Sequence, residues 1–230
     1  MKKLLISGGK LLLAGTILTS FTNRVNAAAT LTLYDGVNPL ITIVDNGPGD
    51  MFGATGAILV ATNVGVWNLT ISSAITKPLF GSSTDPVMDL GITANSSGAG
   101  SLRFVFSDND FGPVAIGSTL VATVDGQVNG APATVTYDVY GDPFNVVGAT
   151  TVHIASTGTS SLPTSATGSG PLALPAPFSL TQVDEFVASG PTTINSDASF
   201  KVVVPEPGLL GLGALGVAVL ALGRSQRRRA

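Results

Sequence analysis

The chain has 230 residues with no cysteine and one histidine, and its 11 Lys and Arg against 14 Asp and Glu give a formal net charge of −3. Without cysteine, disulfides, thiolate zinc sites and cysteine nucleophiles are excluded, and a single histidine excludes zinc sites that use two or more. The length is sufficient for a core that needs no cross-links.

The N-terminus has the pattern of an export signal. Three lysines among the first ten residues precede the apolar stretch 11–21, and small residues follow around Val25 and Ala27. A signal peptidase requires this order of basic, apolar and small residues. We expect residues 1–27 to be a signal peptide with a helical apolar segment, cut between Ala27 and Ala28. A buried first helix is the alternative.

Residues 28–203 contain short segments in which apolar and polar residues alternate, the period of a half-buried strand. These segments are 30–34, 40–44, 57–62, 66–71, 88–93, 102–106, 134–140, 178–180 and 199–203. Clusters of Gly, Pro, Asn and Asp, such as 45–50 and 125–126, separate them and supply turn geometry. The pattern predicts an all-β fold, an antiparallel β-sandwich over 28–203.

Alternation also predicts which side chains of a strand point into the core, because successive residues face opposite sides of a sheet. The inward sets are Trp67, Leu69 and Ile71, then Leu102, Phe104 and Phe106, then Val135, Tyr137 and Val139. Each set is expected to pack inward.

Residues 155–177 interrupt this pattern. The stretch is mostly Ser, Thr, Gly and Ala before several prolines, which suits a flexible linker or a long excursion between strands. We expect a long loop inside one domain, followed by a final strand at 199–203.

Two acidic clusters are the candidate metal sites. Asp45 and Asp50 flank an Asn-Gly-Pro-Gly stretch, and Asp108 and Asp110 flank Asn109. Carboxylate and amide oxygens in loops are the ligands that Ca²⁺ requires, although neither cluster matches an EF-hand loop. Turn formation explains the same residues. Calcium is therefore a candidate at these aspartates, and no other cofactor is expected.

The C-terminal segment has the pattern of a membrane span. Residues 208–223 carry no charge, and as a helix they would reach about 24 Å, slightly short of the roughly 30 Å hydrocarbon core. Arg224 can extend this reach by lifting its guanidinium toward the headgroups. Arg224, Arg227, Arg228 and Arg229 favour the cytoplasmic side, which leaves the preceding domain outside. A plain C-terminal anchor satisfies these observations.

The order of the segments in this C-terminal tail resembles a known sorting signal. Val204-Pro205-Glu206-Pro207, a short apolar span and an arginine-rich end are similar to the PEP-CTERM sorting domain of Gram-negative bacteria that produce exopolysaccharide. The resemblance covers residues 204–230. It implies recognition by an exosortase, cleavage near the Pro-Glu-Pro, and passage from the inner membrane to the cell surface or extracellular matrix.

Removal of both ends changes the charge balance. Between residues 28 and 206 only Lys77, Arg103 and Lys201 stand against all fourteen acidic residues, a net charge near −11. An acidic domain argues against nucleic-acid binding, which relies on cationic contacts to phosphate. Two function classes remain: a structural protein of the envelope or matrix, associated with exopolysaccharide, and a secreted module that binds carbohydrate or a protein partner, with or without calcium.

We expect no catalytic role. Alternation places His153 on a solvated face, and no Gly-x-Ser-x-Gly elbow accompanies it. Carboxylate pairs serve glycosidases, but fourteen acidic residues make some pair inevitable in any fold. Trp67, the only tryptophan, is expected in the core and not on a sugar-binding platform.

Overall fold

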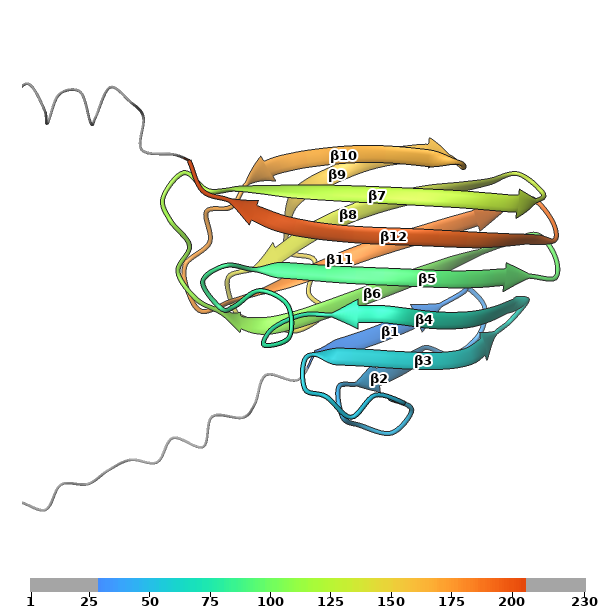
Figure 1. The fold of residues 1–230 in the computed structure, drawn as a ribbon, viewed down its shortest axis with the longest axis horizontal. Coiled ribbons are helices and arrows are strands. Elements are labelled where there is room, and N and C mark those ends of the chain that lie inside the picture. The colour runs from blue at the N-terminus through green and yellow to red at the C-terminus, as the bar shows by residue number, and fades with distance from the viewer. Residues whose placement is uncertain (1–28, 206–230) are drawn as a thin grey trace, which may run out of the picture.

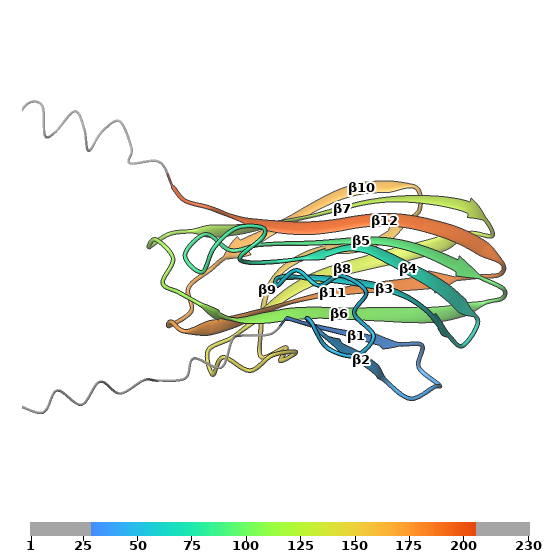
Figure 2. The same cartoon turned by 60° about the horizontal axis from the view of Figure 1, so that its bottom comes forward.

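The structure is a computed structural model that describes residues 29–205. It contains twelve strands in two antiparallel six-stranded sheets that pack face to face (Figures 1 and 2). The first sheet has the order β2 (Ile41–Val44), β1 (Thr30–Tyr34), β6 (Gly100–Phe111), β11 (Phe178–Ala188), β8 (Ala133–Asp142), β9 (Val152–Ser161). The second has the order β10 (Thr164–Pro171), β7 (Thr119–Gly130), β12 (Thr192–Val203), β5 (Val87–Ser96), β4 (Trp67–Ile75), β3 (Ala57–Val64). The all-β fold and the sandwich arrangement are confirmed.

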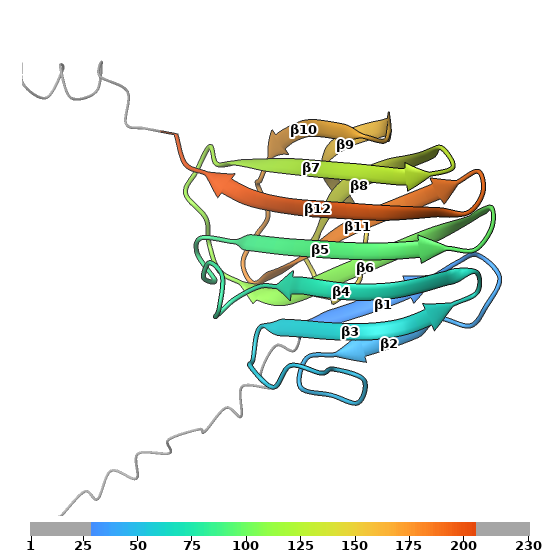
Figure 3. The same ribbon diagram turned by 45° about the vertical axis from the view of Figure 1, so that its right-hand side comes forward.

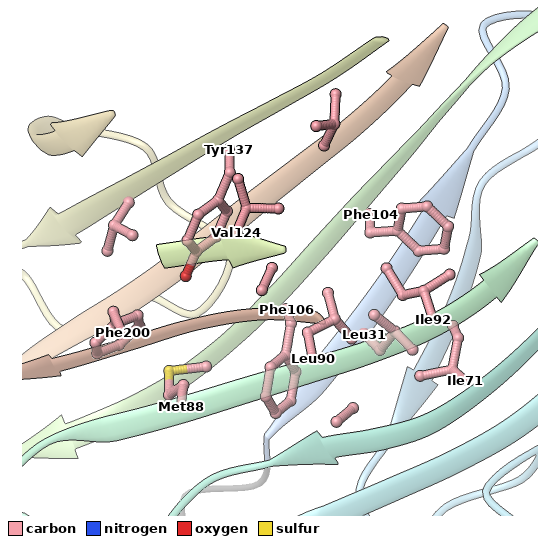
Figure 4. Close-up of a cluster of buried hydrophobic side chains, with 14 of the residues drawn as sticks. Leu31, Ile71, Met88, Leu90, Ile92, Phe104, Phe106, Val124, Tyr137 and Phe200 are labelled. Atoms are coloured by element: carbon pink, nitrogen blue, oxygen red, sulfur yellow. The ribbon is translucent and has the colours of Figure 1, made fainter. Parts of the chain in front are cut away.

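The core lies between the two sheets, where the inward residues of both form one apolar cluster (Figure 4). The three inward sets expected from alternation are all buried, and Trp67 is 1% exposed. Its indole Nε1 donates to the backbone oxygen of Ser101 at 3.0 Å, so its one polar atom is satisfied inside the core. The rings of Phe104 and Phe186 meet edge to face with centroids 5.4 Å apart.

The expected loop at 155–177 is wrong for most of its length. Strand β9 continues to Ser161, and β10 pairs with β7 from Thr164 to Pro171, leaving only the short turn 162–163 and the loop 172–177. The small residues that resemble a linker have a packing role, because a Cβ at Gly168 or Gly170 would overlap a backbone carbonyl oxygen of β9. Their absence of side chains lets β9 and β10 close one side of the sandwich, as Figure 3 shows.

Two expected turns are also wrong. Residues 125–126 lie within β7, and 108–110 form the end of β6. Gly126 is an inward position of β7 whose missing side chain leaves room for Leu162. The expected turn at 45–50 is confirmed, because the chain reverses there directly after β2.

The two ends of the sandwich differ. Short turns join β3 to β4, β5 to β6, β7 to β8 and β11 to β12 on the right of Figure 1. At the other end are the connections 76–86, 112–118, 143–151 and 172–177, here called the loop end, and beside them the connection from β2 to β3, whose Gly56 O accepts from Thr76 N at 2.8 Å. The loops of the loop end are joined by hydrogen bonds: Gly112 N donates to Ser83 O at 2.6 Å and Leu172 N donates to Ser118 O at 3.0 Å. Strand β12 ends on this side.

The expected signal helix and the expected span at 208–223 lie outside the described residues. Within 29–205, no helix is long and apolar enough to cross a membrane.

Candidate functional site

The beginning of the expected sorting motif is exposed. Strand β12 ends at Val203, which pairs with Thr119 of β7, and Val204 follows with 53% of its surface exposed. Pro205 is exposed as well. The other residues assigned to sorting and processing lie outside 29–205, namely Ala27, Ala28, Glu206, Pro207, Arg224, Arg227, Arg228 and Arg229.

Asp45 and Asp50 lie in one loop, and their carboxylates bind that loop's own amides. Asp45 Oδ2 accepts from Gly56 N at 2.7 Å, and Oδ1 accepts from the Asn46 side chain at 2.9 Å. Asp50 accepts from three backbone amides, two from within the loop and one from Leu59 of β3. Both aspartates therefore brace the connection between β2 and β3, which is the turn-forming role.

Asp108 and Asp110 point to different partners at the end of β6. Asp108 is 1% exposed, and its Oδ2 accepts from Lys77 Nζ at 2.7 Å and from Thr76 Oγ1 at 2.9 Å. Burial raises the pKa of Asp108, and Lys77 opposes that shift. Asp110 Oδ1 accepts from the Asn145 amide at 2.6 Å.

The Lys77 ammonium group is held on three sides. Besides Asp108, its Nζ donates to the backbone oxygen of Asn109 at 2.6 Å and lies 4.5 Å from the centre of the Phe111 ring. The link ties the connection between β4 and β5 to the end of β6. Across residues 29–205, no group of three or more His, Cys, Asp or Glu side chains is placed to hold a metal ion.

A different set of carboxylates lies on the outer face of the second sheet. Asp125 of β7 and Asp197 of β12 are exposed and are directly paired across the two strands. Gly91 of β5 is paired with Asp197 on its other side, and Asp89 lies two residues before Gly91. Partial burial, and then the neighbouring Asp197 carboxylate, raise the pKa of Asp89 to about 6.

Asp125 and Asp197 border a shallow hollow of about 380 Å³ on this face. It extends over β4, β5, β12 and β7, and Gly91 is part of its lining. Its rim carries amides and hydroxyls, and Thr93 Oγ1 donates to Asn195 Oδ1 at 2.9 Å. The hollow thus combines hydrogen-bonding groups with the Asp125 and Asp197 carboxylates. We name this region, from Asp89 to Asp125 across the sheet, the acidic face.

The acidic face does not follow from the sequence patterns alone. The expected turn at 125–126 belongs to it, and alternation of apolar and polar residues predicts β12 only over 199–203. The available signal was the polar alternation Thr193, Asn195, Asp197, Ser199, which matches the outward half of a strand with period two.

A cluster of polar side chains is buried in the core. Tyr137 donates its hydroxyl to Gln182 Oε1 at 2.9 Å, and both residues are fully buried. Asp184 is paired with Tyr137 across β11 and β8, and neither of its carboxylate oxygens has a hydrogen-bond partner among residues 29–205. Burial raises the pKa of Asp184 well above its ordinary value. Burial therefore favours the neutral acid of Asp184 over its carboxylate.

His153 lies on the surface of β9, as expected. Its side chain is 50% exposed and its Nε2 lies 3.2 Å from Asp138 Oδ1. The ring also meets Tyr140 edge to face, with centroids 5.1 Å apart.

No protein-family model and no curated protein matches the chain. Among solved structures, the chain is similar to the enzymatically active domain of tailspike protein 4 of bacteriophage CBA120, at 14% sequence identity and a TM-score of 0.35. The match covers 69% of this chain and 21% of the tailspike chain, so the chain spans about a fifth of that protein's length. At this TM-score the likeness carries no argument about fold or function.

Proposed function

We propose that the chain is an exported surface or extracellular-matrix protein with no catalytic role, sorted and cleaved at its C-terminus by an exosortase. The observation that carries this proposal is the order of Val204-Pro205-Glu206-Pro207, the apolar run and the arginine cluster directly after the last strand of the sandwich. The exposure of Val204 and Pro205 supports it, because a membrane-embedded protease needs access to the chain beyond the folded domain.

The two ends of the chain then have defined roles. Residues 1–27 form the signal helix that a signal peptidase removes at Ala27 and Ala28. Residues 208–223 form a helix that spans the inner membrane until cleavage, with the arginines from Arg224 to Arg229 on the cytoplasmic side. The sandwich is thereby delivered outside the inner membrane and onward to the cell surface or matrix.

The charge of the sandwich suits an extracellular matrix more than a nucleic-acid partner. Lys77, one of three cations in residues 28–206, is already bound to Asp108. A strongly negative surface keeps such a domain soluble at high local concentration. Association with exopolysaccharide is the role that this composition and the resemblance of the tail favour together.

Localisation in a bacterium that makes exopolysaccharide and encodes an exosortase tests this proposal. The full chain should appear in the medium or on the cell surface of the parent strain and in the inner-membrane fraction of an isogenic exosortase deletion. Glu206→Ala should behave like the deletion, whereas Glu185→Ala, a matched change at an exposed glutamate of β11, should behave like the native chain. If the chain is found in the same fractions in both strains, its C-terminal tail acts only as a membrane anchor.

The acidic face supports a second candidate function, a module that binds carbohydrate or a protein partner with or without calcium. Its hollow offers amide, hydroxyl and carboxylate groups that are already ordered by cross-strand hydrogen bonds. Reproducible binding of the exported chain to one sugar class on a glycan array, lost in Asn195→Ala, would favour this function. Binding that persists in Asn195→Ala would place the sugar site elsewhere.

A further inference from the structure

We propose that the loop end of the sandwich rests on the lipid surface of the membrane while the chain is anchored, with Ile116 and Phe144 in contact with the lipid interface. This inference rests on the proposed function, since it requires that residues 208–223 span the bilayer. It adds an orientation of the domain and a set of contacts that anchoring alone does not require.

The loop end presents apolar side chains to its surroundings. Ile116 is 101% exposed, Phe144 is 79% exposed, and Leu79 and Val146 are each more than half exposed. They come from three different loops, and hydrogen bonds connect these loops to one another and to the end of β6. Large apolar side chains that are exposed near the point where the chain leaves the folded domain favour contact with an apolar partner.

The exit point of the chain lies beside Ile116. A Cβ at Gly117 would stand 3.3 Å from Cγ of Pro205, so the loop 112–118 and the last described residue are in contact range. The apolar run begins at Gly208, three residues after Pro205. Even a fully extended chain covers about 3.3–3.6 Å per residue, so the start of the span lies within roughly 11 Å of Pro205. The loop end cannot be far from the headgroups.

The carboxylates at this end do not oppose such a contact strongly. Asp142 is buried and accepts from Thr151 Oγ1 at 2.6 Å, and the exposed Asp110 accepts from the Asn145 side-chain amide of the 143–151 loop at 2.6 Å. Asp85 is exposed, which favours a shallow contact at the interface over deep insertion. Ile and Phe side chains gain from burial at the boundary of headgroups and acyl chains.

The absence of cysteine allows a direct test in the full chain. Single cysteines at Ile116, Phe144 and Val37 would each carry a polarity-sensitive fluorophore. Val37 is the matched control, because it is an apolar residue that is 86% exposed in the connection between β1 and β2. The labelled chains are reconstituted in vesicles of phosphatidylethanolamine and phosphatidylglycerol, with a lipid-attached quencher as the second readout.

The expected result is a blue-shifted emission and lipid quenching at 116 and 144, with neither at 37. Equal emission at 116 and 37 in a chain that floats with the vesicles would overturn the orientation and leave the anchor intact. A blue shift that is the same in detergent, and accompanied by dimers in gel filtration, would assign the loop end to a second copy of the chain and overturn the lipid contact. Failure to float would contradict the anchor itself.

Discussion

The aspartates of the β2–β3 connection and of the end of β6 differ from those of the acidic face in what surrounds them. Asp108, Asp45 and Asp50 each accept hydrogen bonds from lysine, hydroxyl or amide donors nearby. Asp125 and Asp197 face each other across two strands. The hydrogen bonds of the first group stabilise the fold, and this structural role accounts for those aspartates. Like charges placed directly opposite each other, in contrast, reduce stability. A surface that keeps them is the better candidate for a function outside the fold.

The largest expected effect is at Asp108. Asp108→Ala leaves Lys77, whose side chain is 14% exposed, without its carboxylate partner, and breaking a buried pair in this way costs about 3–5 kcal/mol of unfolding free energy. Urea unfolding of the exported chain measures it. Asp125→Ala, at an exposed position on the acidic face, is the control and should change the unfolding free energy far less. Similar losses at both positions would erase the contrast between the two groups.

The next largest effect is expected at Asp184 in the core. Asp184 is buried like Asp108, but neither of its carboxylate oxygens has a hydrogen-bond donor among residues 29–205. Its pKa is raised in the folded state, so the folded chain holds a proton that the unfolded chain releases above pH about 4. Stability is therefore lost as the pH rises toward the folded-state pKa. Asp184→Asn stays neutral and should gain on the native chain by about 1–3 kcal/mol between pH 4 and pH 8.

Urea midpoints at the two pH values measure this gain. Gln182→Glu, which places a new ionisable group beside Asp184 on the inner face of β11, should instead lose stability over the same pH range. A pH-independent difference between Asp184→Asn and the native chain would mean that the acid is not held neutral.

A smaller loss of stability is expected when the hydrogen bonds of Asp50 in the connection between β2 and β3 are removed. Asp50→Ala removes the acceptor of three backbone amides and should cost about 1–2 kcal/mol, measured by the thermal midpoint. Calcium is tested in the same experiment, since Asp45 and Asp50 are the calcium candidates of this loop. A calcium-dependent rise in the native midpoint that disappears in Asp50→Ala would make the loop a metal site and not only a turn.

The smallest effect is expected on the acidic face and has the opposite sign. Asp197→Asn removes the carboxylate beside Asp89 and the one opposite Asp125, so it should stabilise the chain by up to about 1 kcal/mol at pH 7. It should also bring the pKa of Asp89 down from about 6, which NMR titration of the carboxyl carbon detects. Asp125→Asn, which leaves Asp197 in place, should keep that pKa raised. Destabilisation by Asp197→Asn would mean that the acidic face is structural.

The strands with strong alternation could be predicted from the sequence, and those with polar or small inward residues could not. Trp67, Phe104 and Tyr137 are large inward residues, and the strands that carry them were recognised. Alternation predicts strand β11 only over 178–180, because Gln182 and Asp184 occupy inward positions that normally hold apolar residues. Patterns of hydrophobicity do not reveal a strand whose inner face is polar.

Strand β10 was missed for a related reason. Its Gly168 and Gly170 are defined by close approach to the backbone of β9, a contact between strands that no local pattern contains. The acidic face depends on the same kind of information, since Asp89, Asp125 and Asp197 come from three strands and meet only through the register of the sheet. Asp45 and Asp50 are only five residues apart in the sequence, and the turn expected between them is confirmed.

The intact mass of the mature protein, purified from a bacterium that encodes an exosortase, tests the central proposal most directly. Cleavage at both ends predicts a chain that begins near Ala28 and lacks the apolar run and the four arginines of 224–229. A mature protein whose mass includes Arg229 and Ala230 would contradict C-terminal processing and reduce the tail to an anchor.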